Sequence, residues 1–229
     1  MSNSVFAQID ACVFDAYGTL FDVSSAVAGL CERVGPQHAQ LSAQWRTRQL
    51  EYTWLRSLMQ SHADFWQVTS EALWVSLREV GIDDPELHED LMQAYLRLAA
   101  FPEVLGVLKL LKQAGIKTAI LSNGSPQMIQ SAVTNAGIQD VIDESLSVES
   151  VGVFKPAAAV YQLAVDSLGV EKERIAFMSS NAWDASGAAH FGFNVAWVNR
   201  YSQPSELLPG APSAMLADLS ELPTLLGVC

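Results

Sequence analysis

Four short runs of mainly apolar residues are spread along the chain, and polar or turn-forming residues end each of them. The runs occupy residues 8–14, 116–121, 175–178 and 195–198. Apolar runs of about four to eight residues that stop at turn residues are typical of strands buried on both faces of a sheet. We therefore predict four buried strands, each of which ends in polar side chains.

Helical stretches separate these runs, and proline and glycine mark their ends. The three stretches extend from Pro102 to Gly115, from Pro126 to Gly137 and from Pro156 to Gly169. Proline in the first turn and glycine just after the last turn are the expected start and stop residues. Strands that alternate with helices predict a Rossmann-like α/β fold, in which a parallel sheet has helices on both faces. The strands then end at one edge, where open α/β sheets bind ligands.

Residues 24–100 interrupt this alternation and contain no strand-like run. Their apolar residues recur at helical spacing in two stripes, which are Leu41, Trp45, Tyr52, Leu55 and Met59, and Leu87, Leu91, Tyr95 and Leu98. Such stripes are typical of amphipathic helices. We expect an all-helical cap subdomain at residues 22–100, inserted into an α/β core domain that comprises residues 1–21 and 101–229.

The charge and the cysteines exclude several classes of partner. The net charge is −12, and the 13 Lys and Arg residues form no basic run, so we expect neither nucleic acid nor a membrane as a partner. No segment approaches about 18 uninterrupted apolar residues, and the first ten residues do not resemble a signal peptide. The odd, widely spaced set of Cys12, Cys31 and Cys229 predicts a reduced, cytoplasmic protein.

Asp15 is the first candidate for chemistry, because it follows the first predicted strand in the segment VFDAYGT. Free backbone N–H groups of the turn favour its ionised form, and an ionised carboxylate is a candidate nucleophile that can form a covalent ester. An aspartate that merely caps a turn is the alternative for this residue taken alone. Polar side chains farther along the chain follow the later strands, namely Ser122, Asn123, Lys155, Ser179, Asn181 and Asp184. Their convergence on one edge favours a functional site.

Four motifs, in this order and spacing, resemble those of the haloacid dehalogenase superfamily. They are VFDAYGTLFDV, ILSNGS, VFKP and MSSNAWD. The aromatic residue Tyr17, the stretch WRTRQLEYTWLRSLM and the segment SSNAWD are similar to its L-2-haloacid dehalogenase branch. The resemblance extends over about residues 8–200. It implies a hydrolase that needs no cofactor and forms a homodimer.

Two positions argue against the phosphatases of that superfamily. By the resemblance, those enzymes carry a second aspartate two residues after the nucleophile, which protonates the leaving alcohol, whereas this chain has Tyr17 there. They also hold Mg²⁺ with a late acidic pair, whereas the segment 179–184 contains one acid, Asp184. A halide leaves as a weak base and needs no proton. A Mg²⁺-dependent phosphomonoesterase and a non-catalytic binding protein on the same scaffold are the alternatives.

The resemblance predicts a metal-independent reaction in two steps. Asp15 attacks C2 of a short-chain L-2-haloalkanoic acid from the side opposite the halogen and forms an ester. Water then cleaves the ester at the Asp15 carbonyl, so that C2 is inverted once and a D-2-hydroxyacid results. Arg46 and Asn123 would stabilise the departing halide. Ser122 and the turn amides that begin at Ala16 would bind the substrate carboxylate.

The resemblance also assigns supporting roles. Lys155 would steady the Asp15 carboxylate and Tyr161 would support Lys155, while Thr19 would donate a hydrogen bond to Asp15. Asp184, with Ser179 and Asn181, would orient or deprotonate the water. The apolar wall would consist of Tyr17, Leu50, Phe65 and Trp183. Lost donors in such sites reduce rates by on the order of 10²–10³.

Some of these residues have a plainer alternative when taken alone. Lys155 is then a solvated loop lysine, Arg46 is a surface arginine paired with an acid, and Asp184 is a helix N-cap. Two positions also depart from the family pattern, since Thr47 replaces a longer amide and Ala157 replaces a polar residue. The sequence leaves open the preferred chain length and halogen, including fluorine.

Overall fold

The computed structural model describes residues 5–228, and within them the central element is a six-stranded parallel sheet. Its strands are β1 (Ala11–Phe14), β2 (Lys117–Ser122), β3 (Glu144–Ser147), β4 (Ile175–Ser179), β5 (Asn194–Val198) and β6 (Ala214–Leu216). They are arranged in the order β3-β2-β1-β4-β5-β6, and every neighbouring pair is parallel. The predicted α/β class is confirmed.

The four predicted strands correspond to β1, β2, β4 and β5, which are almost entirely buried. The sequence did not reveal β3 and β6, which form the two edges of the sheet. Both are short and partly exposed, and β3 has the sequence ESLS. An edge strand has no need of a continuous apolar run, because solvent reaches one of its sides.

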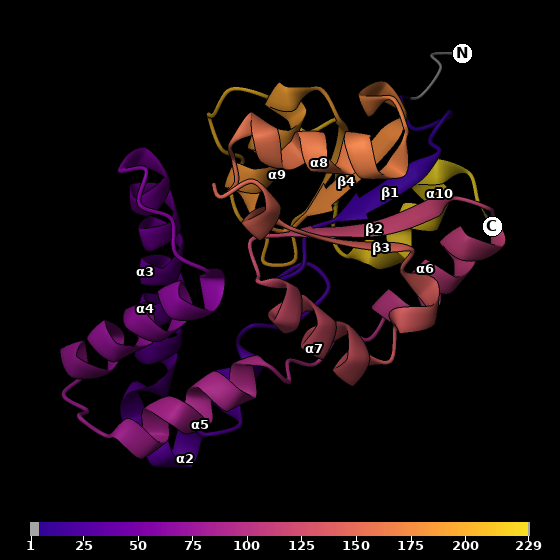
Figure 1. The fold of residues 1–229 in the computed structure, drawn as a ribbon. Helices are drawn as coiled ribbons and strands as arrows, with labels where there is room; N and C mark the ends of the chain where they lie inside the picture. The colour runs from indigo at the N-terminus through magenta and orange to yellow at the C-terminus, as the bar shows by residue number, and fades with distance from the viewer. Residues whose placement is uncertain (1–4, 229) are drawn as a thin grey trace.

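Helices cover both faces of the sheet, as Figure 1 shows, with α8 and α9 on one face and α6 and α7 on the other. These helices are α6 (Val104–Gln113), α7 (Pro126–Ala136), α8 (Ala158–Leu168), α9 (Ala182–Phe191) and α10 (Leu222–Leu226). Short 3₁₀ turns occur at Gly35–Gln37, Gln139–Val141, Val148–Ser150, Lys172–Arg174 and Leu219–Glu221. The predicted stop residues Gly137 and Gly169 adopt the left-handed conformation that ends a helix at low cost.

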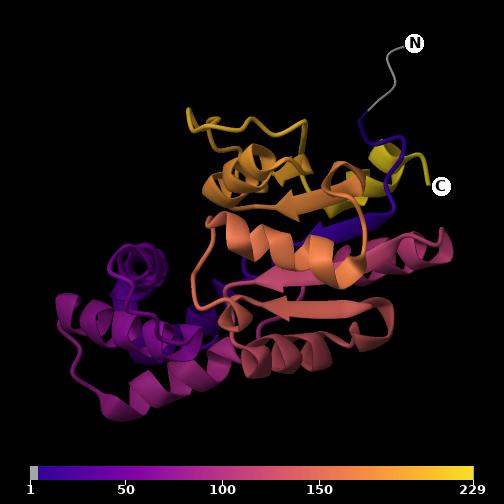
Figure 2. The same ribbon diagram turned by 45° about the horizontal axis from the view of Figure 1, so that its top comes forward.

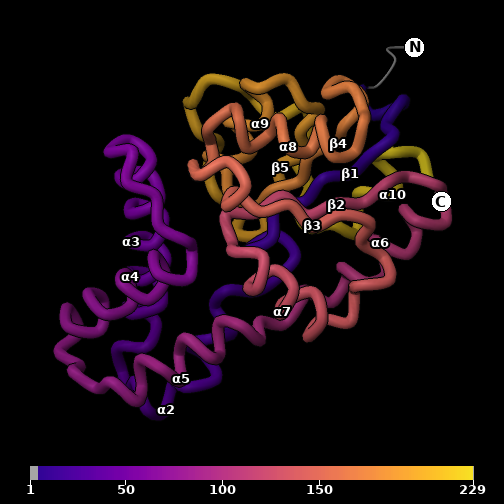
Figure 3. The backbone as a smooth tube through the Cα atoms, in the orientation of Figure 1, coloured from indigo at the N-terminus to yellow at the C-terminus, as the bar shows by residue number. Residues whose placement is uncertain are grey.

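The segment between β1 and α6 is helical and lies beside the sheet in Figures 1 and 3. Its helices are α1 (Ser25–Ala28), α2 (Cys31–Val34), α3 (His38–Leu58), α4 (Phe65–Glu79) and α5 (Pro85–Tyr95). Helix α3 packs along α4, and α5 packs against α1 and α4. Figure 2 shows that the strands point their carboxyl ends toward this helical segment. The division into two domains at these residue numbers stays a prediction.

The two linkers between the sheet and the helical segment run side by side. Phe21 and Ala100 form an antiparallel bridge, and the Phe101 amide donates to the Leu20 carbonyl at 3.0 Å. Arg200, at the end of β5, donates to the carbonyl of Thr19 at 2.8 Å, and its guanidinium carbon lies 3.8 Å from the centre of the Phe101 ring. The end of β5 is therefore attached to both linkers.

The buried stripe of α3 differs from the apolar stripe in the sequence. Its buried side chains are Leu41, Trp45, Gln49 and Thr53. Leu55, Leu58 and Met59 are exposed, with 50%, 81% and 66% of their surface accessible. The last turns of the helix thus present apolar side chains to solvent, while two polar residues occupy the interior.

Candidate active site

The carboxyl edge of the sheet brings together the polar residues that the sequence singled out. Asp15 directly follows β1, Asn123 follows β2, and Asn181 lies just beyond β4. Lys155 approaches from the loop before α8, and Asp184 lies in the first turn of α9. Figure 2 shows this edge facing the helical segment, so a ligand bound here lies between the two regions.

The two carboxylate oxygens of Asp15 have different surroundings. Oδ2 accepts hydrogen bonds from Thr19 Oγ1 at 3.1 Å, Ser179 Oγ at 3.3 Å and Asn181 Nδ2 at 2.7 Å. Oδ1 contacts the Lys155 ammonium at 3.2 Å. The Asp15 side chain is 8% exposed, and these donors hold its carboxylate in one orientation. Because Oδ2 is fully occupied, Oδ1 is the oxygen with a lone pair free to react.

Lys155 is buried between two carboxylates. Its Nζ lies 3.2 Å from Asp15 Oδ1 and 2.8 Å from Asp184 Oδ2, and its side chain is 1% exposed. Burial by itself would lower the pKa of Lys155, but the charges of Asp15 and Asp184 outweigh it and raise that pKa above its ordinary value. The ammonium therefore stays charged. The alternative of a solvated loop lysine is wrong.

Asp184 is completely buried and accepts two strong hydrogen bonds. Tyr161 donates to its Oδ1 at 2.8 Å, and Lys155 donates to its Oδ2 at 2.8 Å. Burial raises the pKa of Asp184, against the opposing effect of Lys155. The N-cap position of α9 is occupied by Asn181, so the alternative of Asp184 as an N-cap is wrong.

Tyr161 supports Lys155 indirectly. Its hydroxyl donates to Asp184, and Asp184 in turn accepts a hydrogen bond from the Lys155 ammonium. Burial and the Asp184 charge raise the pKa of Tyr161, so the phenol keeps its proton. Gly187 makes this approach possible, because a Cβ there would lie 2.6 Å from the Tyr161 hydroxyl and 2.6 Å from Pro156 Cβ.

Arg46 extends from α3 to the sheet side of the site. Its Nη2 donates to Asn181 Oδ1 at 3.1 Å and to the Tyr17 carbonyl at 3.4 Å, and its Nη1 donates to Gln49 Oε1 at 2.8 Å. These partners are neutral, so the alternative of a surface arginine paired with an acid is wrong. Asn181 connects the arginine to the nucleophile, because its amide group also donates to Asp15.

Ser122 and Asn123 organise the turn after β2. Ser122 Oγ accepts the Gly124 amide at 3.0 Å, which leaves its own proton for a ligand. Asn123 Oδ1 accepts the Lys155 amide at 3.0 Å, and its Nδ2 makes no hydrogen bond to a residue that the structure describes. Asn123 therefore positions the lysine loop in addition to offering a donor. Ala16 is buried directly after Asp15.

Aromatic side chains form the apolar side of the site. The rings of Tyr17 and Phe65 are buried, with centroids 5.8 Å apart. Trp183 meets Trp54 of α3 edge-on at 5.4 Å, and Leu50 lies one turn after Arg46 on the same helix. The Tyr17 hydroxyl is buried and has no hydrogen-bond partner among residues 5–228. Such a wall excludes water and strengthens the electrostatic interactions inside it.

The helical segment also contacts the sheet domain beside Phe65. Glu149 Oε1 accepts the Phe65 amide at 3.3 Å, while its Oε2 lies 2.9 Å from His62 Nε2. The His62 ring packs on Phe154, next to Lys155, at 4.9 Å. The sequence indicated no role for His62.

The two departures from the family pattern lie near the site without entering its charged centre. Thr47 is exposed on α3. Ala157 occupies the N-cap position of α8, where it provides no side-chain hydrogen bond. Their effects on the pocket and on Lys155 stay predictions.

Gln49 is the residue that sequence reasoning missed. It is a buried amide on α3 that binds Arg46. The available signal was its position, since a glutamine four residues after Trp45 and three after Arg46 continues the buried stripe of the helix. A polar residue in such a stripe needs a partner.

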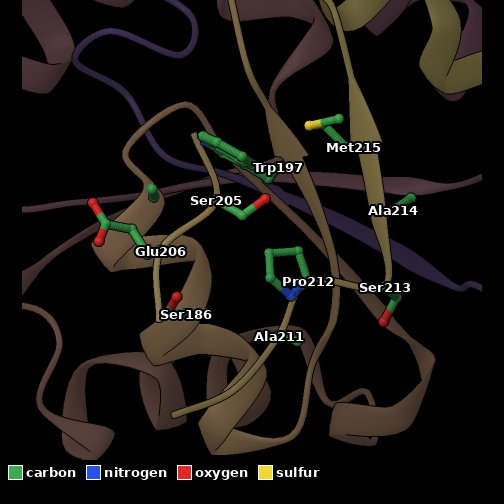
Figure 4. Close-up of a pocket in the computed structure, with 10 residues that line it drawn as sticks. Ser186, Trp197, Ser205, Glu206, Ala211, Pro212, Ser213, Ala214 and Met215 are labelled. Carbon is green, nitrogen blue, oxygen red and sulfur yellow. The ribbon is translucent and has the colours of Figure 1, made fainter. Parts of the chain in front are cut away.

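A cavity of the sheet domain lies apart from this cluster. Figure 4 shows it between Trp197 of β5, Met215 of β6 and the loop that carries Ser205 and Pro212, and its volume is about 380 Å³. Neither Asp15 nor Lys155 lines it.

Among residues 5–228, no group of three or more His, Cys, Asp or Glu side chains is arranged to hold a metal ion. No helix in the described residues is long and apolar enough to cross a membrane.

Comparison with known proteins relates this geometry to a family. The family model described as haloacid dehalogenase-like hydrolase matches residues 9–192. The chain belongs to this family. The match extends from β1 through α9 and so includes Asp15, Lys155 and Asp184, whereas β6 and α10 lie beyond it.

Individual members of the family resemble the chain over most of its length. It is 45% identical over 219 residues to (S)-2-haloacid dehalogenase 1 of Pseudomonas sp. strain CBS-3, which covers 95% of this chain and 96% of the relative. It is 49% identical over 206 residues to (S)-2-haloacid dehalogenase of Pseudomonas sp. strain YL, which covers 89% and 88%.

A solved structure of a family member has the same fold. It is that of L-2-haloacid dehalogenase from Xanthobacter autotrophicus with chloropropionic acid covalently bound. The TM-score is 0.90 at 40% identity, and the match covers 96% of this chain and 98% of that one.

Proposed function

We propose that this haloacid dehalogenase-like hydrolase is an (S)-2-haloacid dehalogenase, which converts short-chain L-2-haloalkanoic acids into D-2-hydroxyacids and halide. The buried arrangement of Asp15, Lys155 and Asp184 carries the proposal, because it provides a carboxylate nucleophile, a base and a fixed cation that lies within hydrogen-bond distance of both. The names of the relatives, and the covalently bound chloropropionic acid in one of them, support the substrate class and an ester intermediate.

In the first step, Asp15 Oδ1 attacks C2 of the substrate on the side opposite the halogen. The new bond is O–C2, and the C2–halogen bond breaks with both its electrons, so C2 is inverted. The hydrogen bonds on Oδ2 from Thr19, Ser179 and Asn181 hold the carboxylate in one orientation. The Arg46 guanidinium and the free amide donor of Asn123 receive the halide, and Ser122 with the turn amides binds the substrate carboxylate.

In the second step, water attacks Cγ of the Asp15 ester. Asp184 takes a proton from that water, and the tetrahedral oxyanion is stabilised by the Lys155 ammonium, which contacts both aspartates. The Cγ–O bond to the substrate then breaks, the departing alkoxide takes back the proton that Asp184 holds, and the regenerated Asp15 carboxyl releases its own proton to water, as the proton that accompanies the halide. Since no bond to C2 changes, the product keeps the inverted configuration.

We propose that no metal ion takes part. Lys155 occupies the space between Asp15 and Asp184, and its single positive charge offsets part of their negative charge, as a metal cation would. A halide needs no proton on leaving, which agrees with an aromatic residue, Tyr17, at the position of a second acid.

We also propose that the reaction takes place in the cytoplasm, since Cys12 and Cys31 are unpaired thiols, whereas Cys229 lies outside the described residues.

We propose a homodimer, for which the exposed end of α3 supplies the contact. Leu58 and Met59 are 81% and 66% exposed there, and adjoining Leu55 is 50% exposed. Apolar side chains gathered in this way favour burial against a second copy. A light-scattering mass of one chain would contradict the dimer.

The decisive experiment is a single turnover of L-2-chloropropionate in H₂¹⁸O with enzyme in excess, with and without chelator. We expect chloride release and D-lactate in both samples, with ¹⁸O in Asp15 and absent from the first product. Asp184→Asn should accumulate the ester on Asp15, visible by mass spectrometry. Label that enters the product directly would contradict the ester. Phosphate release from a phosphoester that chelator abolishes, without chloride release, would indicate a phosphatase.

A further inference from the structure

Gln49 stands out among the buried polar residues of the helical segment, because it is 1% exposed and contacts Arg46, which donates to Asn181 beside the nucleophile. We propose that Gln49 is a positioning residue, which holds the Arg46 guanidinium in place through its Oε1 and thereby controls halide departure. The inference rests on the proposed dehalogenase function and adds a residue to which neither the sequence motifs nor the resemblance assigns a role.

The orientation of the Gln49 amide follows from its neighbours. Thr69 Oγ1 donates its only proton to the Phe65 carbonyl at 2.6 Å, so it can act toward Gln49 only as an acceptor. The group 2.7 Å from Thr69 Oγ1 must therefore be the Gln49 NH₂ group. This leaves Oε1 directed at Arg46 Nη1, at 2.8 Å.

Three helices hold the amide in this orientation. Gln49 belongs to α3, Thr69 to α4 and Tyr95 to α5, and the Tyr95 hydroxyl lies 3.2 Å from Gln49 Nε2. Because each of these side chains is buried, none can turn toward solvent for another partner. Gln49 is therefore a rigid support on which the long arginine side chain rests.

The neutrality of Gln49 is as important as its position. Arg46 is bound by the amide oxygens of Gln49 and Asn181, so no carboxylate in these contacts cancels its charge. An arginine oriented by neutral acceptors keeps its full attraction for an incoming anion. A glutamate at position 49 would instead pair with the guanidinium and weaken its interaction with halide.

A purely structural role for Gln49 makes a different prediction. If the amide merely joins α3, α4 and α5, its loss should lower stability and slow all substrates by the same factor. If it positions Arg46 for halide departure, its loss should slow chloride release more than bromide release. Chloride is the poorer leaving group and depends more on stabilisation in the transition state.

The test compares Gln49→Met and Gln49→Glu with the wild type, using L-2-chloropropionate and L-2-bromopropionate in single turnovers with enzyme in excess. We expect Gln49→Met to slow chloride release about tenfold, which is less than the loss of a direct donor, and bromide release severalfold less. Gln49→Glu should slow chloride further and relieve inhibition by added bromide. Thr53→Val is the matched control, since Thr53 is buried one turn later and bonds to the Leu50 carbonyl instead of Arg46.

An unchanged bromide-to-chloride ratio in both Gln49 variants would overturn the inference, whatever their overall rates. Should Gln49→Met fail to fold, the isosteric Gln49→Glu decides the question. If neither folds, Tyr95→Phe removes the hydroxyl that contacts both the Gln49 amide and the Arg46 side chain and should raise the ratio by a smaller factor, and an unchanged ratio would again overturn the inference. Failure of the proposed function itself is distinguishable, because the wild type would then release no halide from either substrate.

Discussion

On the sheet side of the active site, the charged side chains are buried and paired with one another, whereas on the helical side the half-buried guanidinium of Arg46 is held by neutral groups. Lys155 Nζ lies 3.2 Å from Asp15 Oδ1 and 2.8 Å from Asp184 Oδ2, so the three side chains form a continuous chain of contacts. Arg46 bonds to Gln49, Asn181 and a backbone carbonyl.

This difference assigns separate tasks to the two regions. Charges buried in a sheet must be compensated within the protein, because each would otherwise be costly to keep out of water. The reactive group is therefore built into the fold of the core. The charge of the Arg46 guanidinium is not neutralised by its acceptors, which are neutral. The helical side is therefore suited to attract and orient an anion.

The largest expected effect follows from removing the shared cation. Lys155→Met leaves two carboxylates buried without their counter-charge, so we expect the free energy of unfolding to fall by about 3–5 kcal/mol and halide release to fall by about 10³-fold or more. Urea denaturation and a halide assay measure the two quantities. Lys109→Met, on the exposed side of α6, should change neither.

The matched change on the helical side is Arg46→Met. It should slow halide release by on the order of 10²–10³, yet change the free energy of unfolding by less than about 1 kcal/mol, since no buried charge loses its partner. Equal destabilisation by the two variants would show that the sheet and helical sides do not differ in this way.

A smaller effect is expected at the base. Asp184 must be ionised to accept a proton, so the rate of ester hydrolysis falls as the pH drops through its pKa, which burial raises. The Tyr161 hydrogen bond opposes that shift. Tyr161→Phe should therefore raise the pKa of Asp184 further. The fall in the rate of ester hydrolysis at low pH should then begin at a pH that is higher by up to about one unit.

The measurement is the decay of the Asp15 adduct as a function of pH, followed by mass spectrometry after rapid quenching. Tyr201→Phe serves as control, because Tyr201 is 65% exposed and away from Asp184. If the low-pH fall in the decay rate stays at the same pH in Tyr161→Phe, or moves to lower pH, Asp184 is not the base.

The smallest effect concerns the contact between Glu149 and the start of α4. Both Glu149 and His62 are partly exposed, with side chains 22% and 26% accessible, and such pairs contribute less than about 1 kcal/mol. Glu149→Gln should raise KM by about two- to threefold, leave kcat nearly unchanged, and differ less from the wild type at high salt. Steady-state kinetics at two salt concentrations test this. A large loss of kcat would place the helical contact on a par with the buried charges.

The residues that could be predicted from the sequence are those whose role depends on their place in a strand or motif. Asp15 and Asn181 were found because strand ends of a parallel sheet converge. The edge strand β3 was not found, since its sequence ESLS has no buried run to reveal it. Gln49 was missed for another reason. The orientation of its amide depends on contacts with Thr69 and Tyr95, which belong to other helices.

The burial of α3 shows a further limit. Periodicity correctly predicted a helix, but it did not distinguish residues packed against α4 from residues near the helix end. Leu55 and Met59 continue the apolar spacing and are nonetheless exposed. Which part of an amphipathic helix is covered depends on the length of its neighbours, and the pattern of a single helix carries no such information.

The bridge between Phe21 and Ala100 has a consequence for how new specificities can arise. It brings the two ends of the helical segment together at one point. A segment of another length can therefore be inserted there without a change in the order of the strands in the sheet. Arg200 keeps hold of that junction from the sheet side. The helical segment that covers the site can thus be replaced in evolution, while the charged residues of the sheet domain stay the same.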